Sequence, residues 1–207
     1  MKPAPIQFAI TLLAAASCCC AAVTHAQMSP APAPADPLQS LTQVVTRFEN
    51  NLLALAEAMP ADKFNFAPTK DTFAPASPAE FATVRTFAQQ LTHVSGEPFR
   101  LLAPFGVKPD ADVDVKSFDS LSAKDEIIKA LKASFEYQDK VIAGITPENA
   151  FTPAGPRNLS RVAALVAILN DDGDHYGQMV EYLRMNGITP PATVNQQRRA
   201  AQAPQQN

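Results

Sequence analysis

The chain has 207 residues, of which 46% are hydrophobic, and its formal net charge at pH 7 is −3. A chain of this length and composition can bury one hydrophobic core, so we expect one folded domain with appendages. Its lysines and arginines form no cluster interleaved with aromatic residues, so we expect no nucleic-acid partner.

The first 26 residues have the features of a secretory signal peptide. Lys2 supplies a short positive region, residues 8–23 form an apolar run, and small residues precede a cleavage site expected after Ala26. A membrane-spanning helix needs about 20 apolar residues, and this run passes directly into proline-rich polar chain. We therefore expect a secreted or periplasmic protein with no membrane attachment after cleavage.

All three cysteines of the chain lie in this leader, at residues 18–20. A lipoprotein is the weaker alternative, because the residues before the cysteines lack the large aliphatic side chain usual at the third position back. Cleavage after Ala26 removes the cysteines, so the mature protein has no disulfide and no thiolate ligand. Cleavage also removes His25, which leaves His93 and His175 as the histidines of the mature chain.

Polar segments of low complexity flank the predicted domain. Residues 27–37 are rich in proline and alanine and predict an extended linker. Residues 194–207 are polar and contain no aromatic side chain, which predicts a disordered tail. The folded domain is therefore expected over residues 38–193.

Apolar residues that recur at steps of three and four predict amphipathic helices within this domain. The first helix is predicted over residues 38–59. The second is predicted over residues 77–102, with Ser77 as its N-cap and Glu80 completing a capping box. Pro98 removes one backbone hydrogen bond and should kink this second helix.

Two further helices and a long connection complete the predicted fold. The third helix is predicted over residues 122–144, with a serine N-cap and a glycine stop. The fourth begins near Asn158 or Ser160 and ends at residues 186–187. Strand-like alternation is absent from the sequence, so an all-α four-helix bundle is expected. Residues 104–120 are long enough to form a crossover connection within it.

Both mature histidines fall midway along predicted helices, and acidic residues stand one turn away. Asp171 precedes His175 by four residues, and Glu97 follows His93 by four, so each pair shares one helix face. Two imidazoles and a carboxylate form the ligand set of a mononuclear zinc, iron or nickel site with positions left for water and substrate. In the alternative interpretation each histidine only hydrogen-bonds a neighbouring carboxylate, and "DDGD" is a solvated acidic face.

Two stretches of the sequence resemble the DinB/YfiT-like superfamily of damage-inducible four-helix proteins. They are "RTFAQQLTHV" (residues 85–94) and "DHYGQMVEYLRMNGITPP" (residues 174–191). The resemblance extends over roughly residues 41–191 and includes "MPADKFNFAP" at residues 59–68. It implies a helix bundle in which the second helix provides one histidine to a metal site and the fourth provides two, four residues apart.

Carried over by position, the ligands implied by the resemblance are His93, Asp171 and His175. Asp171 departs from the family pattern, which has histidine there. An anionic oxygen in place of a neutral nitrogen favours a harder ion and makes a bound metal a weaker Lewis acid. The expected cofactor is one divalent transition metal, namely zinc, nickel, iron or manganese. Three other residues are expected to support the ligands: Glu97, Asp174 and Tyr176.

Two classes of function remain open. The first is a metal-dependent enzyme, because the resemblance includes thiol-dependent transferases, in which the metal presents a small thiol to an electrophile. Metal-assisted hydrolysis is a variant of this class. The second is a non-catalytic small-ligand or interaction module with a degenerate metal site, for which a homodimer is one arrangement. The sequence identifies neither the small-molecule ligand nor a substrate.

Overall fold

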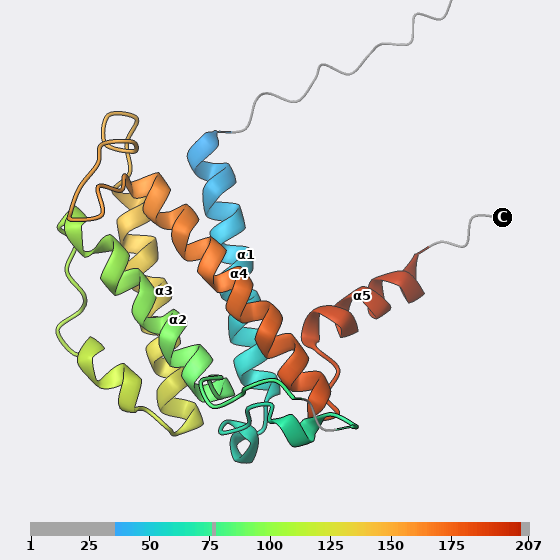
Figure 1. The fold of residues 1–207 in the computed structure, drawn as a ribbon. Coiled ribbons are helices and arrows are strands. Elements are labelled where there is room, and N and C mark those ends of the chain that lie inside the picture. The colour runs from blue at the N-terminus through green and yellow to red at the C-terminus, as the bar shows by residue number, and fades with distance from the viewer. Residues whose placement is uncertain (1–35, 76–77, 204–207) are drawn as a thin grey trace, which may run out of the picture. The chain divides into compact units, whose positions relative to one another are not determined.

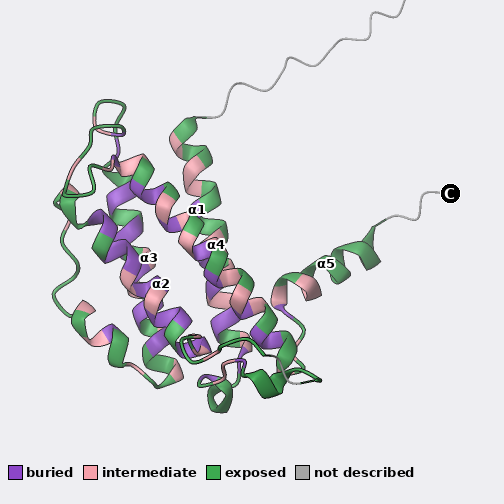
Figure 2. Ribbon diagram, in the orientation of Figure 1, coloured by how far each residue is buried: buried purple, intermediate pink, exposed green. Residues whose placement is uncertain are grey.

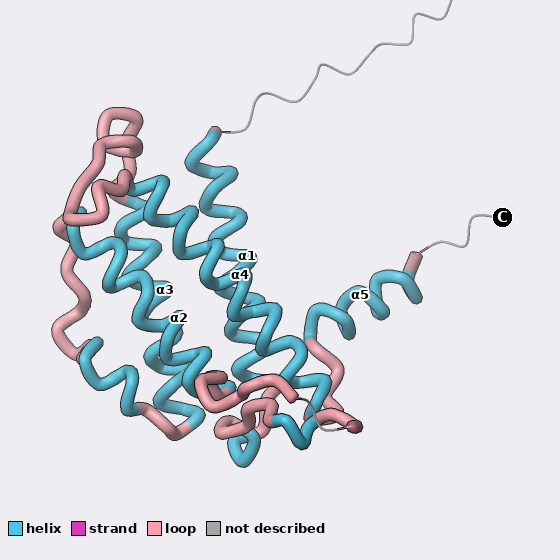
Figure 3. The backbone as a smooth tube through the Cα atoms, in the orientation of Figure 1, coloured by secondary structure: helices cyan, strands magenta, loops and turns pink. Residues whose placement is uncertain are grey.

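A computed structural model describes residues 36–75 and 78–203 (Figure 1). These residues belong to one unit that starts at Ala35. Figure 3 shows helices and loops throughout the described ranges, which makes this part of the chain all-α as predicted. The predicted signal peptide, nearly all of the linker, the proposed N-cap Ser77 and residues 204–207 lie outside the described residues.

The described chain contains five α-helices and four short 3₁₀ helices. The α-helices are α1 (Pro37–Ala58), α2 (Phe87–Leu102), α3 (Lys124–Ala143), α4 (Arg161–Met185) and α5 (Pro191–Gln202). The 3₁₀ helices are η1 (Ala61–Lys63), η2 (Lys70–Thr72), η3 (Ala103–Phe105) and η4 (Val115–Ser120). The first and fourth predicted helices are therefore confirmed close to their predicted ends. In the ranges that the structure covers, no helix is both long and apolar enough to cross a membrane.

Helix α2 begins at Phe87, so the predicted start at Ser77 is wrong. The N-cap is Thr86, which forms a capping box with Gln89. The first two N–H groups of the helix donate to backbone carbonyls within residues 64–66. This long-range pairing satisfies amides that a helix start leaves free. It cannot be predicted from the periodicity of the sequence.

The start of α3 also differs from the prediction. Ala123 is the N-cap and provides no side-chain hydrogen bond, so the predicted serine cap is wrong. The amide of Ile127 closes the first turn on the carbonyl of Ala123. The predicted stop is confirmed, because Gly144 follows the last helical residue.

Residues 191–202 form α5 where a disordered tail was expected from residue 194 onward, so that expectation is wrong for the described part of the tail. The prediction of disorder depended on the polar composition of this segment. The segment is, however, rich in alanine, glutamine and arginine, which have high helix propensity. Proline at the first helical position has a backbone angle that already suits a helix. Thr193 and Val194 are half-buried, and most of the helix is exposed (Figure 2).

Buried apolar side chains form two clusters along the bundle of α1 to α4. The first cluster takes residues from the beginnings of α1 and α4 and from the ends of α2 and α3. The second cluster takes residues from the opposite ends of these helices. Helices α1 and α4 therefore run antiparallel to α2 and α3 (Figure 1). The connection between α2 and α3 returns along the bundle, which confirms the predicted crossover.

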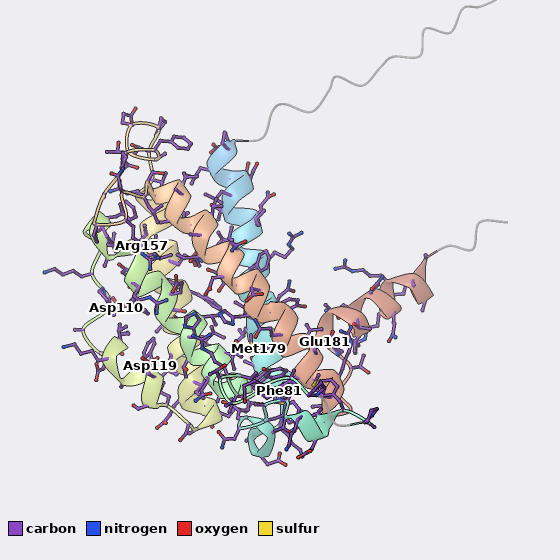
Figure 4. The ribbon with its side chains drawn as sticks, viewed as in Figure 1. Phe81, Asp110, Asp119, Arg157, Met179 and Glu181 are labelled. Atoms are coloured by element: carbon purple, nitrogen blue, oxygen red, sulfur yellow. The ribbon has the colours of Figure 1, made fainter. Side chains whose placement is uncertain are left out.

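Figure 4 shows how α4 separates its inner and outer sides. Met179 lies on the inner side, fully buried in the second cluster, and Glu181 lies on the outer side, where it pairs with Arg184. A residue two positions on is rotated to roughly the opposite face of an α-helix. The inner side of α4 therefore determines what faces α2.

A layer of buried polar side chains interrupts the apolar interior between the two clusters. It draws on all four bundle helices and comprises Glu49, Ser95, Ser134, Gln138, Asp172 and His175. Buried polar groups cost free energy unless they find partners. Such a layer at mid-length of the bundle is where a site built from facing helices is expected.

Candidate metal centre

The three predicted ligands converge between α2 and α4. Nε2 of His93 lies 3.4 Å from Oδ2 of Asp171, and Nε2 of His175 lies 3.6 Å from Oδ1 of Asp171. One ligand atom from each residue can be chosen so that all three lie within 4.8 Å of one another. The structure therefore brings together the three residues that the resemblance implies as ligands.

The helix geometry explains this convergence. Asp171 and His175 stand four residues apart on α4, so their side chains share one face. His93 approaches from the middle of α2, and its ring meets that of His175 edge to face with centroids 4.7 Å apart. The pair of crossing helices, rather than a loop, thus fixes the three side chains.

The site is closed on one side and accessible on the other. The His175 side chain is 5% exposed, whereas those of His93 and Asp171 are 22% and 32% exposed. An ion among the three ligand atoms would have protein behind it at His175. Solvent or a small molecule would reach it past His93 and Asp171.

Burial keeps both imidazoles in the form that can bind a metal. Burial lowers the pKa of His93 and His175 below the usual histidine value, and the nearby charge of Arg85 lowers both further. Asp171 opposes this effect on each ring. Both rings are therefore neutral at pH 7, with lone pairs available for coordination.

Asp171 supplies an independent test of whether the residues fit a cation. Its Oδ2 atom is buried and lies 3.4 Å from Nε2 of His93, but no described residue donates it a hydrogen bond of good geometry. A buried carboxylate oxygen without a well-formed hydrogen bond is costly and calls for an explanation. A divalent ion between this oxygen and two neutral imidazole nitrogens would satisfy it, so the donor set fits a transition metal.

A chain of side-chain amides lies behind His175. Its Nδ1 atom hydrogen-bonds to Oε1 of the buried Gln90. Nε2 of Gln90 donates to Oε1 of Gln178 at 2.7 Å, and Nε2 of Gln178 donates to Oδ2 of Asp174 at 2.9 Å. This chain connects the rear nitrogen of His175 to an exposed carboxylate.

Of the three supporting residues expected from the sequence, only Asp174 is connected to a ligand by hydrogen bonds among the described residues. Asp174 reaches His175 through the two glutamines. Glu97 is buried and pairs with Arg100, while Tyr176 packs against the second apolar cluster. Within the described residues, neither Glu97 nor Tyr176 has a hydrogen bond or ion pair to a ligand.

One cation near the site has no carboxylate partner. Arg85 is exposed, and its charge lowers the pKa of both histidines. Its backbone carbonyl accepts a hydrogen bond of 3.0 Å from the Tyr182 hydroxyl, which anchors the main chain there. Its guanidinium forms no ion pair or hydrogen bond within the part of the chain that is described. Charges of both signs therefore act on the ligands, that of Arg85 and those of Asp171 and Asp174.

Sequence reasoning missed Gln90 and Gln178. A weak signal was available, because Gln90 precedes His93 by three residues and Gln178 follows His175 by three. Residues at this spacing lie on one side of a helix. Glutamine on a helix face has no chemistry of its own to draw attention, so the spacing alone would not have distinguished these residues.

No protein-family model and no curated protein matches the chain. Among solved structures, the chain is similar to a DinB-like protein from Bacillus cereus ATCC 10987, whose crystal structure was determined at 2.01 Å resolution. The TM-score is 0.57 at 15% sequence identity, over 74% of this chain and 95% of that chain. The chain therefore has a DinB-like fold, which confirms at the level of fold the resemblance seen in the sequence.

Proposed function

We propose that this DinB-like chain binds one divalent transition metal through His93, Asp171 and His175. The observation that carries the proposal is the buried Oδ2 of Asp171, which accepts no hydrogen bond of good geometry although two neutral imidazoles lie beside it. Two nitrogens and one carboxylate oxygen suit zinc, nickel, iron or manganese. The charge of Asp171 halves the net charge that a divalent ion would bring into the bundle.

Three protein ligands leave coordination positions for exchangeable groups, and a metal bound there would supply Lewis-acid chemistry. The partial exposure of His93 and Asp171 gives a small molecule access to those positions. The unpartnered guanidinium of Arg85 favours a ligand that carries negative charge. We therefore propose a small anionic molecule as the exchangeable ligand.

Two forms of this function follow from the same site. In the catalytic form the protein is a metal-dependent transferase that uses a thiol, or a hydrolase, and the accessible side of the site supports it. In the non-catalytic form the protein binds a small ligand or a partner. The engagement of Asp174 with Gln178 supports this second form, because it leaves that carboxylate occupied rather than free to move protons.

Metal analysis of untagged protein tests the proposal directly. After zinc, nickel, manganese and iron(II) are offered separately and excess is removed, we expect about one equivalent of at least one metal per chain. The matched control is the double variant His93→Ala/His175→Ala, which should retain its helical circular dichroism and no metal. Equal metal content in wild type and double variant would place binding elsewhere and contradict the proposal.

Asp171→His distinguishes a retuned site from a decayed one. This variant restores three neutral nitrogen ligands and should bind zinc more tightly than wild type, because imidazole suits zinc. If wild type binds none of the four metals and Asp171→His does bind, the metal proposal fails for the natural protein. The non-catalytic form without metal would then replace it.

We further propose that the chain is exported and cleaved after Ala26, on the evidence of Lys2 and the apolar run at residues 8–23. Mass spectrometry of the cell-envelope fraction should find a mature chain that starts at Gln27. The variant Leu13→Arg, which interrupts the apolar run, should remain unprocessed. An intact Met1 species, or an acylated cysteine at the N-terminus, would refute cleavage at this position.

A further inference from the structure

We infer that Gln90 is a positioning residue that holds His175 as the Nδ1–H tautomer and leaves Nε2 as the ligand atom. We infer also that Asp174 sets the direction of the hydrogen-bond chain that does this, through Gln178. The role in metal binding rests on the proposed function. The tautomer itself can be measured in protein without metal.

The direction of the chain is fixed at its exposed end. A carboxylate accepts hydrogen bonds and has no proton to donate. The atom of Gln178 that faces Asp174 at 2.9 Å must therefore be its amide nitrogen. The other amide atom of Gln178, its oxygen, is then the one turned toward Gln90.

The same logic continues to the buried end. The Gln178 oxygen accepts from the Gln90 nitrogen at 2.7 Å, so the Gln90 oxygen is the atom that faces the ring of His175. An amide oxygen only accepts, so Nδ1 of His175 carries the hydrogen. A neutral imidazole has one N–H, which leaves the lone pair on Nε2, the nitrogen that lies 3.6 Å from Asp171.

His93 provides a contrast within the same site. No described residue accepts a hydrogen bond from its Nδ1 atom, and the structure holds no amide chain behind its ring. Its Nε2 atom lies 3.4 Å from Oδ2 of Asp171, so without metal the carboxylate favours a hydrogen on Nε2 of His93, whereas Gln90 holds the hydrogen of His175 on Nδ1. A ligand already held in the correct tautomer and orientation loses less freedom when it binds a metal.

The consequence is a dependence of metal affinity on a residue that does not touch the metal. Loss of a hydrogen-bond partner of a histidine ligand typically weakens metal binding by about 10- to 100-fold. We expect Gln90→Leu, which cannot accept a hydrogen bond, to weaken zinc binding within that range. Gln90→Glu keeps an acceptor toward Nδ1 and should restore binding to within a few-fold of wild type.

The test is long-range ¹H–¹⁵N NMR of protein labelled with [¹⁵N]histidine, purified from full-length expression and stripped of metal with a chelator. The ring signals are assigned from His93→Ala and His175→Ala. At pH 8, where both rings are neutral, we expect a single Nδ1–H tautomer for His175 and mainly the Nε2–H tautomer for His93, whose Nε2 faces Asp171. Gln90→Leu should convert the His175 signals to those of a mixture, while Gln90→Glu should not.

Asp174→Asn tests the direction of the chain. An asparagine can present either its oxygen or its nitrogen to Gln178, so the reason for a single orientation is lost. We expect the His175 signals to move toward a mixture of tautomers, with helical circular dichroism unchanged. An Nε2–H tautomer for His175 in wild type, or unchanged ring signals in Gln90→Leu, would overturn the inference whether or not the protein binds a metal. Unchanged signals in Asp174→Asn would overturn the role of Asp174.

Discussion

Replacing His175 with alanine is expected to lower zinc affinity by more than the roughly 10- to 100-fold that loss of a ligand's hydrogen-bond partner costs. His175 is the most buried of the three proposed ligands and closes the protein side of the site. Its removal would leave His93 and Asp171, which are both partly exposed to water. Isothermal titration with zinc measures the effect, and Asn170→Ala, an exposed change on the same helix, should leave affinity unchanged.

The same titration should weaken as pH falls. Burial lowers the pKa of both His93 and His175, so each ring keeps its lone pair down to a pH below the ordinary histidine value of about 6.5. Affinity should therefore be steady above that value and decline as pH drops through the lowered pKa, because a protonated imidazole cannot ligate. Affinity that stays constant until the bundle itself unfolds in acid would show that neither imidazole binds the metal.

The bundle could be predicted from local patterns because its signals are local. Apolar side chains recur on one face of each helix, and Ser160 and Gly144 mark ends that the structure retains. The start of α2 could not be predicted in this way, since "SPAE" and "TFAQ" both match a capping box. The choice between them depends on the carbonyls of residues 64–66, which only the tertiary fold brings to the helix.

The proposed ligands could likewise be predicted from local spacing, whereas the residues around them depend on the tertiary fold. The spacing of Asp171 and His175 follows from the helical repeat, so their convergence could be predicted from the sequence. The contact between Gln90 and Gln178 joins residues 88 positions apart and depends on how two helices pack. Asp172 shows that a local pattern can also mislead. The stretch "DDGD" resembles a solvated acidic face, but this residue is only 3% exposed.

Two buried acids in the polar layer should make the metal-free protein less stable as pH rises. Burial raises the pKa of Glu49 to about 7, and the charge of Asp139 adds to this, while a hydrogen bond from Gln138 opposes it. Burial raises the pKa of Asp172 to about 8, helped by the charges of Asp171 and Glu49. Both acids therefore hold protons in the folded state at pH values where the unfolded chain has lost them.

The sign of the effect follows from this difference in bound protons. A raised pKa contributes stability that is present in full below the unfolded value, near pH 4, and is lost as pH rises through the folded value. The loss for Glu49 and Asp172 therefore falls between about pH 4 and pH 8. The two histidines act in the opposite direction below about pH 6.5, because their lowered pKa values favour the unfolded chain in acid. Comparison of variants at each pH separates the two effects.

Glu49→Gln and Asp172→Asn replace each acid with an amide that does not titrate and has nearly the same shape. At pH 8 each should raise the free energy of unfolding by on the order of 3 to 5 kcal/mol, because the folded pKa values of about 7 and about 8 lie well above the ordinary 4.5 and 3.8 and one pKa unit corresponds to about 1.4 kcal/mol. Glutamine at position 49 can still accept the hydrogen bond from Gln138. At pH 4, which is close to the ordinary pKa of both acids in the unfolded chain, the gain should fall below about 1 kcal/mol.

Urea unfolding of chelator-treated protein from pH 4 to pH 8 measures this dependence. The control is Asp119→Asn, because Asp119 is an exposed acid on η4 (Figure 4) and its change should leave stability within about 0.5 kcal/mol at every pH. Loss of stability at pH 8 in both buried variants would mean that the folded state contains ionised carboxylates with partners of their own. A gain that appears at pH 8 and disappears at pH 4 requires instead that the bundle folds around protonated acids, so that the polar layer beside the metal site is electrically neutral before any ion binds.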